Sequence, residues 1–102
     1  MSHEGLHEPA ELLTGSTRNL HRALLSLMEE LEAVDWYNQR VDATDDEHLA
    51  KVLAHNRDEE KEHAAMVLEW LRRSDPETNE QLKEYLFKDG SITGHEEETT
   101  GE

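Results

Sequence analysis

Seven positions between Leu49 and Trp70 are spaced alternately by four and three residues, and this spacing restricts the fold more than any other feature of the sequence. Side chains spaced in this way lie along one side of an α-helix and form a seam against a neighbouring helix. The outer four positions are apolar, whereas the middle three are polar. In order, the seam positions are Leu49, Leu53, Asn56, Glu60, His63, Val67 and Trp70.

A second long helix is predicted before this one. It extends from Pro9 to about Ala43 and carries a seam of its own. The segment Thr44–Glu47 has the order Thr-Asp-Asp-Glu, which is the pattern of a capping box and marks the start of the next helix. That helix is predicted to continue to about Arg73. The seam predicted for the earlier helix comprises Leu13, Leu20, Leu24, Leu27, Leu31, Val34 and Val41.

A short third helix is predicted near the C-terminus. The segment Ser74–Glu77 combines a capping residue with a proline at the first helical position, and Asp89–Gly90 marks the end. The expected fold class is therefore all-α, with two long antiparallel helices and a short C-terminal helix. We expect a flexible N-terminus over residues 1–8, one domain over residues 9–90 and an acidic flexible tail over residues 91–102.

The composition excludes several classes of function. The sequence has 25 acidic and 10 basic residues and a net charge of -15, which opposes binding to nucleic acids and to anionic membranes. Cysteine is absent, so any metal must be bound by carboxylates and imidazoles. We see neither a signal peptide nor a membrane span, and we expect a cytoplasmic protein. With 34% hydrophobic residues, the chain is expected to bury its seams against another chain.

The polar residues in the middle of the seam suggest a metal site. Glu60 and His63 form Glu-x-x-His, which places a carboxylate and an imidazole on one helix face. A buried carboxylate is costly unless it is paired or bound to metal. Glu30 lies next to the seam residue Leu31, so it should point toward the same interface. Ferritin-like di-iron bundles use one Glu from each of two helices and Glu-x-x-His from each of the other two, so two copies would supply the set.

Four neighbouring residues allow two interpretations. Tyr37 follows Glu30 by two helical turns, and it is either an interface tyrosine or a group beside bound metal. Trp36 fits packing better than redox chemistry. Glu29 and Glu32 form either a solvated face or a docking site for cations.

At these residues the sequence resembles the encapsulated ferritins, a bacterial and archaeal family packaged as cargo inside encapsulin nanocompartments. The resemblance covers about residues 7–95. It rests on MEELEAVDWY at Met28–Tyr37 and on HNRDEEKEHA at His55–Ala64, with LEWLRR at Leu68–Arg73 and YLF at Tyr85–Phe87 in support.

The resemblance implies a ferritin-like four-helix bundle completed by dimerisation, with the homodimers assembled into a ring-shaped homodecamer. The ferroxidase ligands of the family correspond to Glu30, Glu60 and His63. The tyrosine beside the family's site corresponds to Tyr37, and the neighbouring tryptophan corresponds to Trp36.

Glu29 and Glu32 correspond to an outer carboxylate site that attracts metal in the family. The implied location is the bacterial cytoplasm, inside an encapsulin nanocompartment, with the encapsulin shell protein as a partner. Family members usually end in a short apolar peptide that docks into the shell, whereas nothing apolar follows Ile92 here. Either this peptide has been removed by truncation or targeting to the shell is lost, and we expect truncation.

The expected function is a ferroxidase that oxidises Fe(II) to Fe(III) with dioxygen at a di-iron centre shared between two protomers, for iron storage. Zn, Mn or Ca can occupy such sites as well. Two alternatives stay open. One is a non-catalytic acidic helical interaction module, and the other is a structural zinc or calcium site that holds a helical dimer together.

Overall fold

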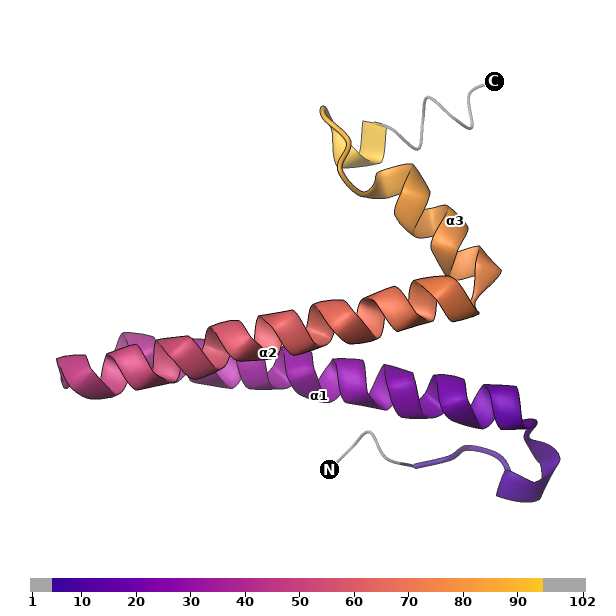
Figure 1. Cartoon of the computed structure of the whole chain (residues 1–102), viewed down its shortest axis with the longest axis horizontal. Helices are drawn as coiled ribbons and strands as arrows, with labels where there is room; N and C mark the ends of the chain where they lie inside the picture. Colours follow the sequence, from indigo (N-terminus) through magenta and orange to yellow (C-terminus); the bar gives the residue numbers. More distant parts are fainter. Residues whose placement is uncertain (1–4, 95–102) are drawn as a thin grey trace. The chain divides into compact units, whose positions relative to one another are not determined.

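The computed structural model describes residues 5–94 and contains a 3₁₀ helix and three α-helices in that range. They are η1 (Ala10–Leu12), α1 (Gly15–Ala43), α2 (Glu47–Ser74) and α3 (Pro76–Tyr85). The predicted all-α class is confirmed. The chain divides into two compact units between Trp70 and Leu71. In the first unit, α1 and α2 lie side by side and run in opposite directions (Figure 1).

The first long helix begins later than predicted. A continuous helix from Pro9 is wrong, because η1 is followed by Leu13 in an extended conformation and α1 starts at Gly15. The hydroxyl oxygen of Thr14 accepts a hydrogen bond from the backbone N–H of Thr17 at 3.1 Å. This bond satisfies one of the N–H groups that a helix start leaves without a partner, which makes Thr14 the N-cap.

The turn between the long helices is three residues long. Thr44 ends α1, because its backbone N–H donates to the carbonyl oxygen of Arg40 at 3.1 Å. Asp46 caps α2: its Oδ1 accepts from the backbone N–H groups of His48 and Leu49 at 3.0 and 3.1 Å. The capping-box pattern predicted Thr44 as the N-cap of this helix, whereas the N-cap is Asp46, two residues later. The Thr44 hydroxyl instead accepts from the backbone N–H of Asp46 at 3.2 Å, within the turn.

The side chains along the facing sides of α1 and α2 are half-buried, apart from Ala64, which is buried. The predicted seams mixed these positions with their neighbours, and Leu24, Leu31, Leu49 and Trp70 are exposed. A spacing of three and four fits two adjacent rows on one helix equally well, so it does not show which row faces the partner. The half-buried rows are Leu20, Ala23, Leu27, Glu30, Val34, Tyr37 and Val41 on α1, and Ala50, Leu53, Arg57, Glu60, Ala64 and Val67 on α2.

A second row of α2 side chains lies beside the facing row, and we call it the His63 stripe. Its two ends are apolar and exposed, whereas its three central members are polar and half-buried. The sequence of residue types is therefore nearly the same in both directions from the centre. The stripe comprises Leu49, Val52, Asn56, Glu59, His63, Met66 and Trp70.

The second unit begins with the end of α2 and contains α3. Pro76 occupies the start of α3, and the guanidinium of Arg72 donates to Asn79 Oδ1 at 2.7 Å. The α-helix ends at Tyr85, before the predicted stop at Asp89–Gly90, because the backbone N–H of Leu86 closes the last turn on Leu82. The predicted flexible ends fall largely on residues 1–4 and 95–102, which lie outside the described residues. Among the described helices, none is long and apolar enough to cross a membrane.

Candidate metal centre

Three of the predicted site residues come together between the long helices. Nδ1 of His63 lies 3.5 Å from Oε2 of Glu30 and 3.8 Å from Oε2 of Glu60. One potential ligand atom from each residue lies within 4.8 Å of the other two. The group therefore joins one carboxylate of α1 to a carboxylate and an imidazole of α2.

Glu30 occupies a position facing α2, which differs from the prediction in detail. The sequence placed Leu31 in the seam and Glu30 beside it, whereas Leu31 is 53% exposed. The side chains of Glu30 and Glu60 are 24% and 25% exposed, and that of His63 is 42% exposed. The two carboxylates are therefore partly withdrawn from water, while the imidazole remains accessible from outside the helix pair.

The carboxylate of Glu60 affects the pKa of Glu30. The pKa of Glu30 is raised above its ordinary value of 4.5, first by a hydrogen bond with Glu60 and then by burial and by repulsion from the Glu60 charge. His63 opposes this rise. A carboxyl group whose charged form is disfavoured by a neighbouring carboxylate gains from a bound cation, which replaces the proton.

The types of donor limit the metals that would fit. Two carboxylates and one imidazole suit Fe(II), Mn(II) and Zn(II), and the absence of thiolates removes the softer sites. Three protein ligands fall short of the octahedral or tetrahedral shell that these ions take. The group can therefore act as part of a larger set of ligands or leave positions open for small molecules.

The other predicted site residues lie near this group but outside it. Tyr37 faces α2 and is half-buried, and the guanidinium carbon of Arg40 lies 5.6 Å from the centre of its ring. Trp36 is exposed. Glu29 is exposed and Glu32 half-buried, and within the described residues neither belongs to the three-residue group. Their assignment to an outer metal site stays a prediction.

The chain is similar to a protein family and to proteins from several bacteria. Residues 5–89 match the EncFtn-like family. The chain belongs to this family. It is 61% identical over 102 residues to the "Encapsulated ferritin-like protein" of Rhodospirillum rubrum, covering 99% of this chain and 73% of the relative. It is also 61% identical over 95 residues to the "Ferritin-like protein" of Thermotoga maritima, covering 93% and 83%.

Two further matches support the EncFtn-like assignment. The "Encapsulin nanocompartment cargo protein EncC" of Myxococcus xanthus is 42% identical over 69 residues, which is 68% of this chain and 53% of that protein. The crystal structure of protein ne0167 from Nitrosomonas europaea superposes with a TM-score of 0.84 at 60% identity, covering 87% of this chain and 98% of the other. The predicted resemblance to the encapsulated ferritins is confirmed.

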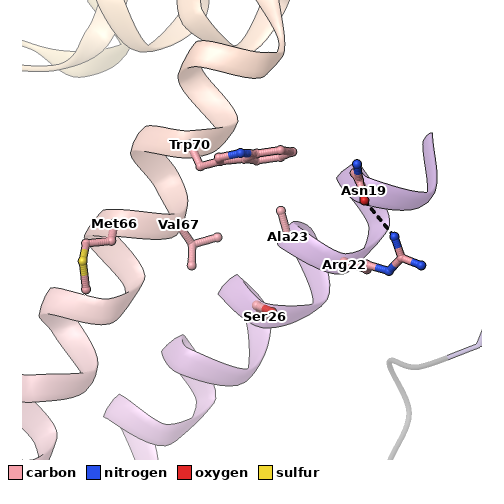
Figure 2. Close-up of a pocket in the computed structure, with 7 residues that line it drawn as sticks. All are labelled: Asn19, Arg22, Ala23, Ser26, Met66, Val67 and Trp70. Atoms are coloured by element: carbon pink, nitrogen blue, oxygen red, sulfur yellow. Dashed lines mark hydrogen bonds between the residues drawn. The ribbon is translucent and has the colours of Figure 1, made fainter. Parts of the chain in front are cut away.

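A groove of this EncFtn-like chain lies between the first half of α1 and the last part of α2 (Figure 2). Figure 2 shows Trp70 and Val67 on α2 opposite Ala23 on α1, with Met66 on the same α2 segment. Ser26, Arg22 and Asn19 complete the α1 side, and the guanidinium of Arg22 donates to Asn19 Oδ1 at 2.7 Å. The α2 side of the groove is therefore apolar, and it contains one end of the His63 stripe.

Sequence reasoning missed a basic residue in the facing row of α2. Arg57 lies one turn before Glu60, and its side chain is 22% exposed. Its Nη1 donates to Oδ1 of Asn38 on α1 at 3.0 Å, and its Nε donates to Oδ1 of Asp58 at 3.1 Å. The hydrogen bond from Arg57 holds the pKa of Asp58 below its ordinary value, and Lys61 adds to the effect. The sequence feature that could have indicated this position is the three-residue interval between Arg57 and Glu60.

Proposed function

We propose that the chain is a ferroxidase, which oxidises Fe(II) to Fe(III) with dioxygen at a di-iron site shared between two copies. The observation that carries the proposal is the half-buried group of Glu30, Glu60 and His63. The group combines the ligand types that iron prefers with a geometry in which all three donors converge. Membership of the EncFtn-like family supports the same reading.

The number of ligands argues for a shared site. A ferritin-like di-iron centre takes one Glu from each of two helices and a Glu-x-x-His pair from each of two more. One chain contributes Glu30 from α1 and the Glu60/His63 pair from α2, which is half of that set. A second copy related by a two-fold axis supplies the other half.

The His63 stripe supports a two-fold arrangement. In such an interface, the same surface of both copies meets in opposite directions. The stripe has apolar ends and a polar centre that contains His63. Two antiparallel copies would therefore pair apolar ends with apolar ends and bring the two ligand groups together. The groove beside Trp70 would receive the Leu49 end of the second copy.

The proposed chemistry follows from the donor set. Two Fe(II) ions give up one electron each, and one dioxygen accepts both electrons together with two protons and leaves as hydrogen peroxide. Carboxylates stabilise Fe(III) more than Fe(II), because a compact anionic shell favours the higher charge. The roles of the protein are to hold two ions at a fixed separation and to supply this charge. We place Tyr37 and Trp36 beside the site, and Glu29 and Glu32 as an outer site where incoming cations gather.

We also propose an encapsulin shell as the partner. The relatives in Rhodospirillum rubrum and Myxococcus xanthus are described as encapsulated and as encapsulin cargo. By this likeness the dimers assemble into a ring-shaped homodecamer inside an encapsulin nanocompartment in the bacterial cytoplasm, and the Fe(III) product is stored in the compartment.

Aerobic oxidation of Fe(II), followed by ultraviolet absorbance, tests the proposal. The unaltered chain should oxidise Fe(II) faster than buffer, and Glu60→Ala should lower the rate at least about tenfold, because loss of a residue that only orients a metal ligand already costs about ten- to a hundredfold. Glu62→Ala is the matched control, since Glu62 is an exposed carboxylate two residues away. It should retain the rate.

Two results would count against the ferroxidase. If the unaltered chain oxidises Fe(II) no faster than buffer, the chain is not a ferroxidase. If metal then raises the melting temperature without oxygen consumption, the group is a structural metal site that holds the helices together. An equal loss of rate in Glu60→Ala and Glu62→Ala would indicate a general effect of charge and reject the assigned site.

A further inference from the structure

Arg57 has a position from which it can compete with metal. Arg57 and Glu60 are three residues apart on α2 and belong to the same half-buried row. Side chains at this spacing have their Cβ atoms about 5–6 Å apart, and a guanidinium readily reaches a carboxylate over that distance. Arginine binds carboxylates through two parallel hydrogen bonds, so a bond to Glu60 would use the oxygens that a metal needs.

The guanidinium of Arg57 is bound elsewhere. Its Nη1 donates to Asn38 at 3.0 Å, and its Nε donates to Asp58 at 3.1 Å. Asp58 is exposed and belongs neither to the row that faces α1 nor to the His63 stripe. Within the part of the chain that the structure describes, Arg57 pairs with Asp58 and not with Glu60.

We infer that Asn38 and Asp58 are positioning residues, which hold Arg57 away from Glu60 so that both carboxylates stay available to Fe(II). The inference deepens the proposed ferroxidase and rests on its metal site. Without the two acceptors, the guanidinium would be free to turn to the carboxylate of Glu60, three residues away in the same row. Metal would then have to displace a cation that is already bound.

A purely structural role of the Arg57–Asn38 bond predicts a different effect of removing Arg57 on metal binding. If the Arg57–Asn38 bond only fastens α1 to α2, removal of Arg57 is as harmful as removal of Asn38. If Asn38 and Asp58 restrain a competitor, removal of Arg57 is harmless, and it also rescues the chain that lacks the two acceptors.

Binding of Co(II), a redox-stable substitute for Fe(II), tests these alternatives on the full chain by calorimetry and visible absorption. Asn38→Ala with Asp58→Ala should raise the dissociation constant about three- to fivefold, which corresponds to breaking one partly exposed ion pair. Arg57→Gln alone should leave the constant unchanged or slightly lower. Arg57→Gln added to the double variant should restore the unaltered affinity.

The matched control is Gln39→Ala with Asp35→Ala. Gln39 Nε2 donates to Asp35 Oδ2 at 3.1 Å within α1, so this pair also joins an amide to an aspartate and its loss changes the charge equally. The control should bind Co(II) as the unaltered chain does. Circular dichroism would verify the helix content, and Asn38→Ala alone is the reserve if the double variant fails to fold.

Three results would overturn the inference. They are an unchanged affinity in the double variant, a loss in Arg57→Gln equal to that in Asn38→Ala, and a triple variant as weak as the double. Failure of the metal site itself gives a different pattern. In that case the unaltered chain does not bind Co(II), or Glu60→Ala leaves the binding unchanged. Either result would reject both the proposed function and this inference.

Discussion

At the scale of single residues, the carboxyl groups of Glu30 and Glu60 interact directly in the metal-free chain. The hydrogen bond between Glu30 and Glu60 raises the pKa of Glu30, and burial adds to the rise. The folded chain therefore binds this proton more tightly than the unfolded chain. The resulting stabilisation is fully present below the ordinary pKa of 4.5 and is lost as the pH rises through the raised pKa of the folded state.

A neutral amide should remove this conflict at neutral pH. Glu30→Gln can donate a hydrogen bond to Glu60 at any pH, so we expect it to stabilise the metal-free chain at pH 7 by up to about 1 kcal/mol. Thermal melts should show a melting temperature higher by about 2–6 °C. The gain should vanish below the ordinary pKa of Glu30, where both chains carry the hydrogen.

Glu29→Gln serves as the control for this melt, because Glu29 is an exposed neighbour on the same helix. A melting temperature for Glu30→Gln equal to or below that of the unaltered chain at pH 7 would contradict the carboxylate conflict. In the presence of Co(II), the unaltered chain should have a higher melting temperature than Glu30→Gln, because the amide is a poor metal ligand.

At the scale of elements, the turn between α1 and α2 decides which side chains of the two helices meet. Three residues, from Thr44 to Asp46, reverse the chain direction. Asp46 caps the second helix through the backbone N–H groups of His48 and Leu49. The cap fixes where α2 starts, and with it the row that contains Glu60.

Loss of this cap should destabilise the fold. Asp46→Ala should lower the free energy of unfolding by about 1 kcal/mol, the usual contribution of an N-cap side chain. Chemical denaturation followed by circular dichroism would measure it. Asp45→Ala is the matched control, as Asp45 is the exposed residue next to the cap. Equal losses in the two variants would show that the charge of the turn matters more than the cap.

At the scale of the whole molecule, one chain has almost no interior. In the described part, Ala64 and Leu71 are the only buried apolar residues, and they are still 7% and 4% exposed. Large apolar side chains remain exposed on the first unit, and those of the His63 stripe lie on both sides of its polar centre. This distribution favours association of the chain with a second copy, because exposed apolar side chains beside polar ones typically mark an interface.

A charge at one end of the stripe should prevent this association. Val52→Glu places a carboxylate at an exposed apolar position of the stripe, two turns from Glu60. We expect the dimer dissociation constant to rise at least about tenfold, as for a buried interface residue. Analytical ultracentrifugation would measure it, and Fe(II) oxidation should fall in parallel although every ligand is retained.

Ile92→Glu is the control for association, because Ile92 is an exposed apolar side chain in the second unit. Ile92→Glu should leave the dimer dissociation constant unchanged. Full oxidation by a Val52→Glu chain that sediments as a monomer would reject the shared site.

Part of the site was predictable from the sequence because it is encoded on single helices. The interval of Glu60 and His63 places both on one face of any α-helix, whatever surrounds it. Glu30 was assigned correctly to the interface, but by a wrong register in which Leu31 faced inward. The Arg57–Asn38 bond was not foreseen, since its two residues are 19 positions apart and meet only when α1 and α2 are paired.

Local periodicity and composition were enough to predict the helical class, the two long helices, the acidic character and the types of candidate metal ligand. The row of each helix that faces the other depends on how α1 and α2 pack, and so do the different environments of Glu30 and Leu31. Adjacent rows of an α-helix share the same three- and four-residue spacing, so the spacing alone does not distinguish them. The choice between them is made by packing, which no single helix contains.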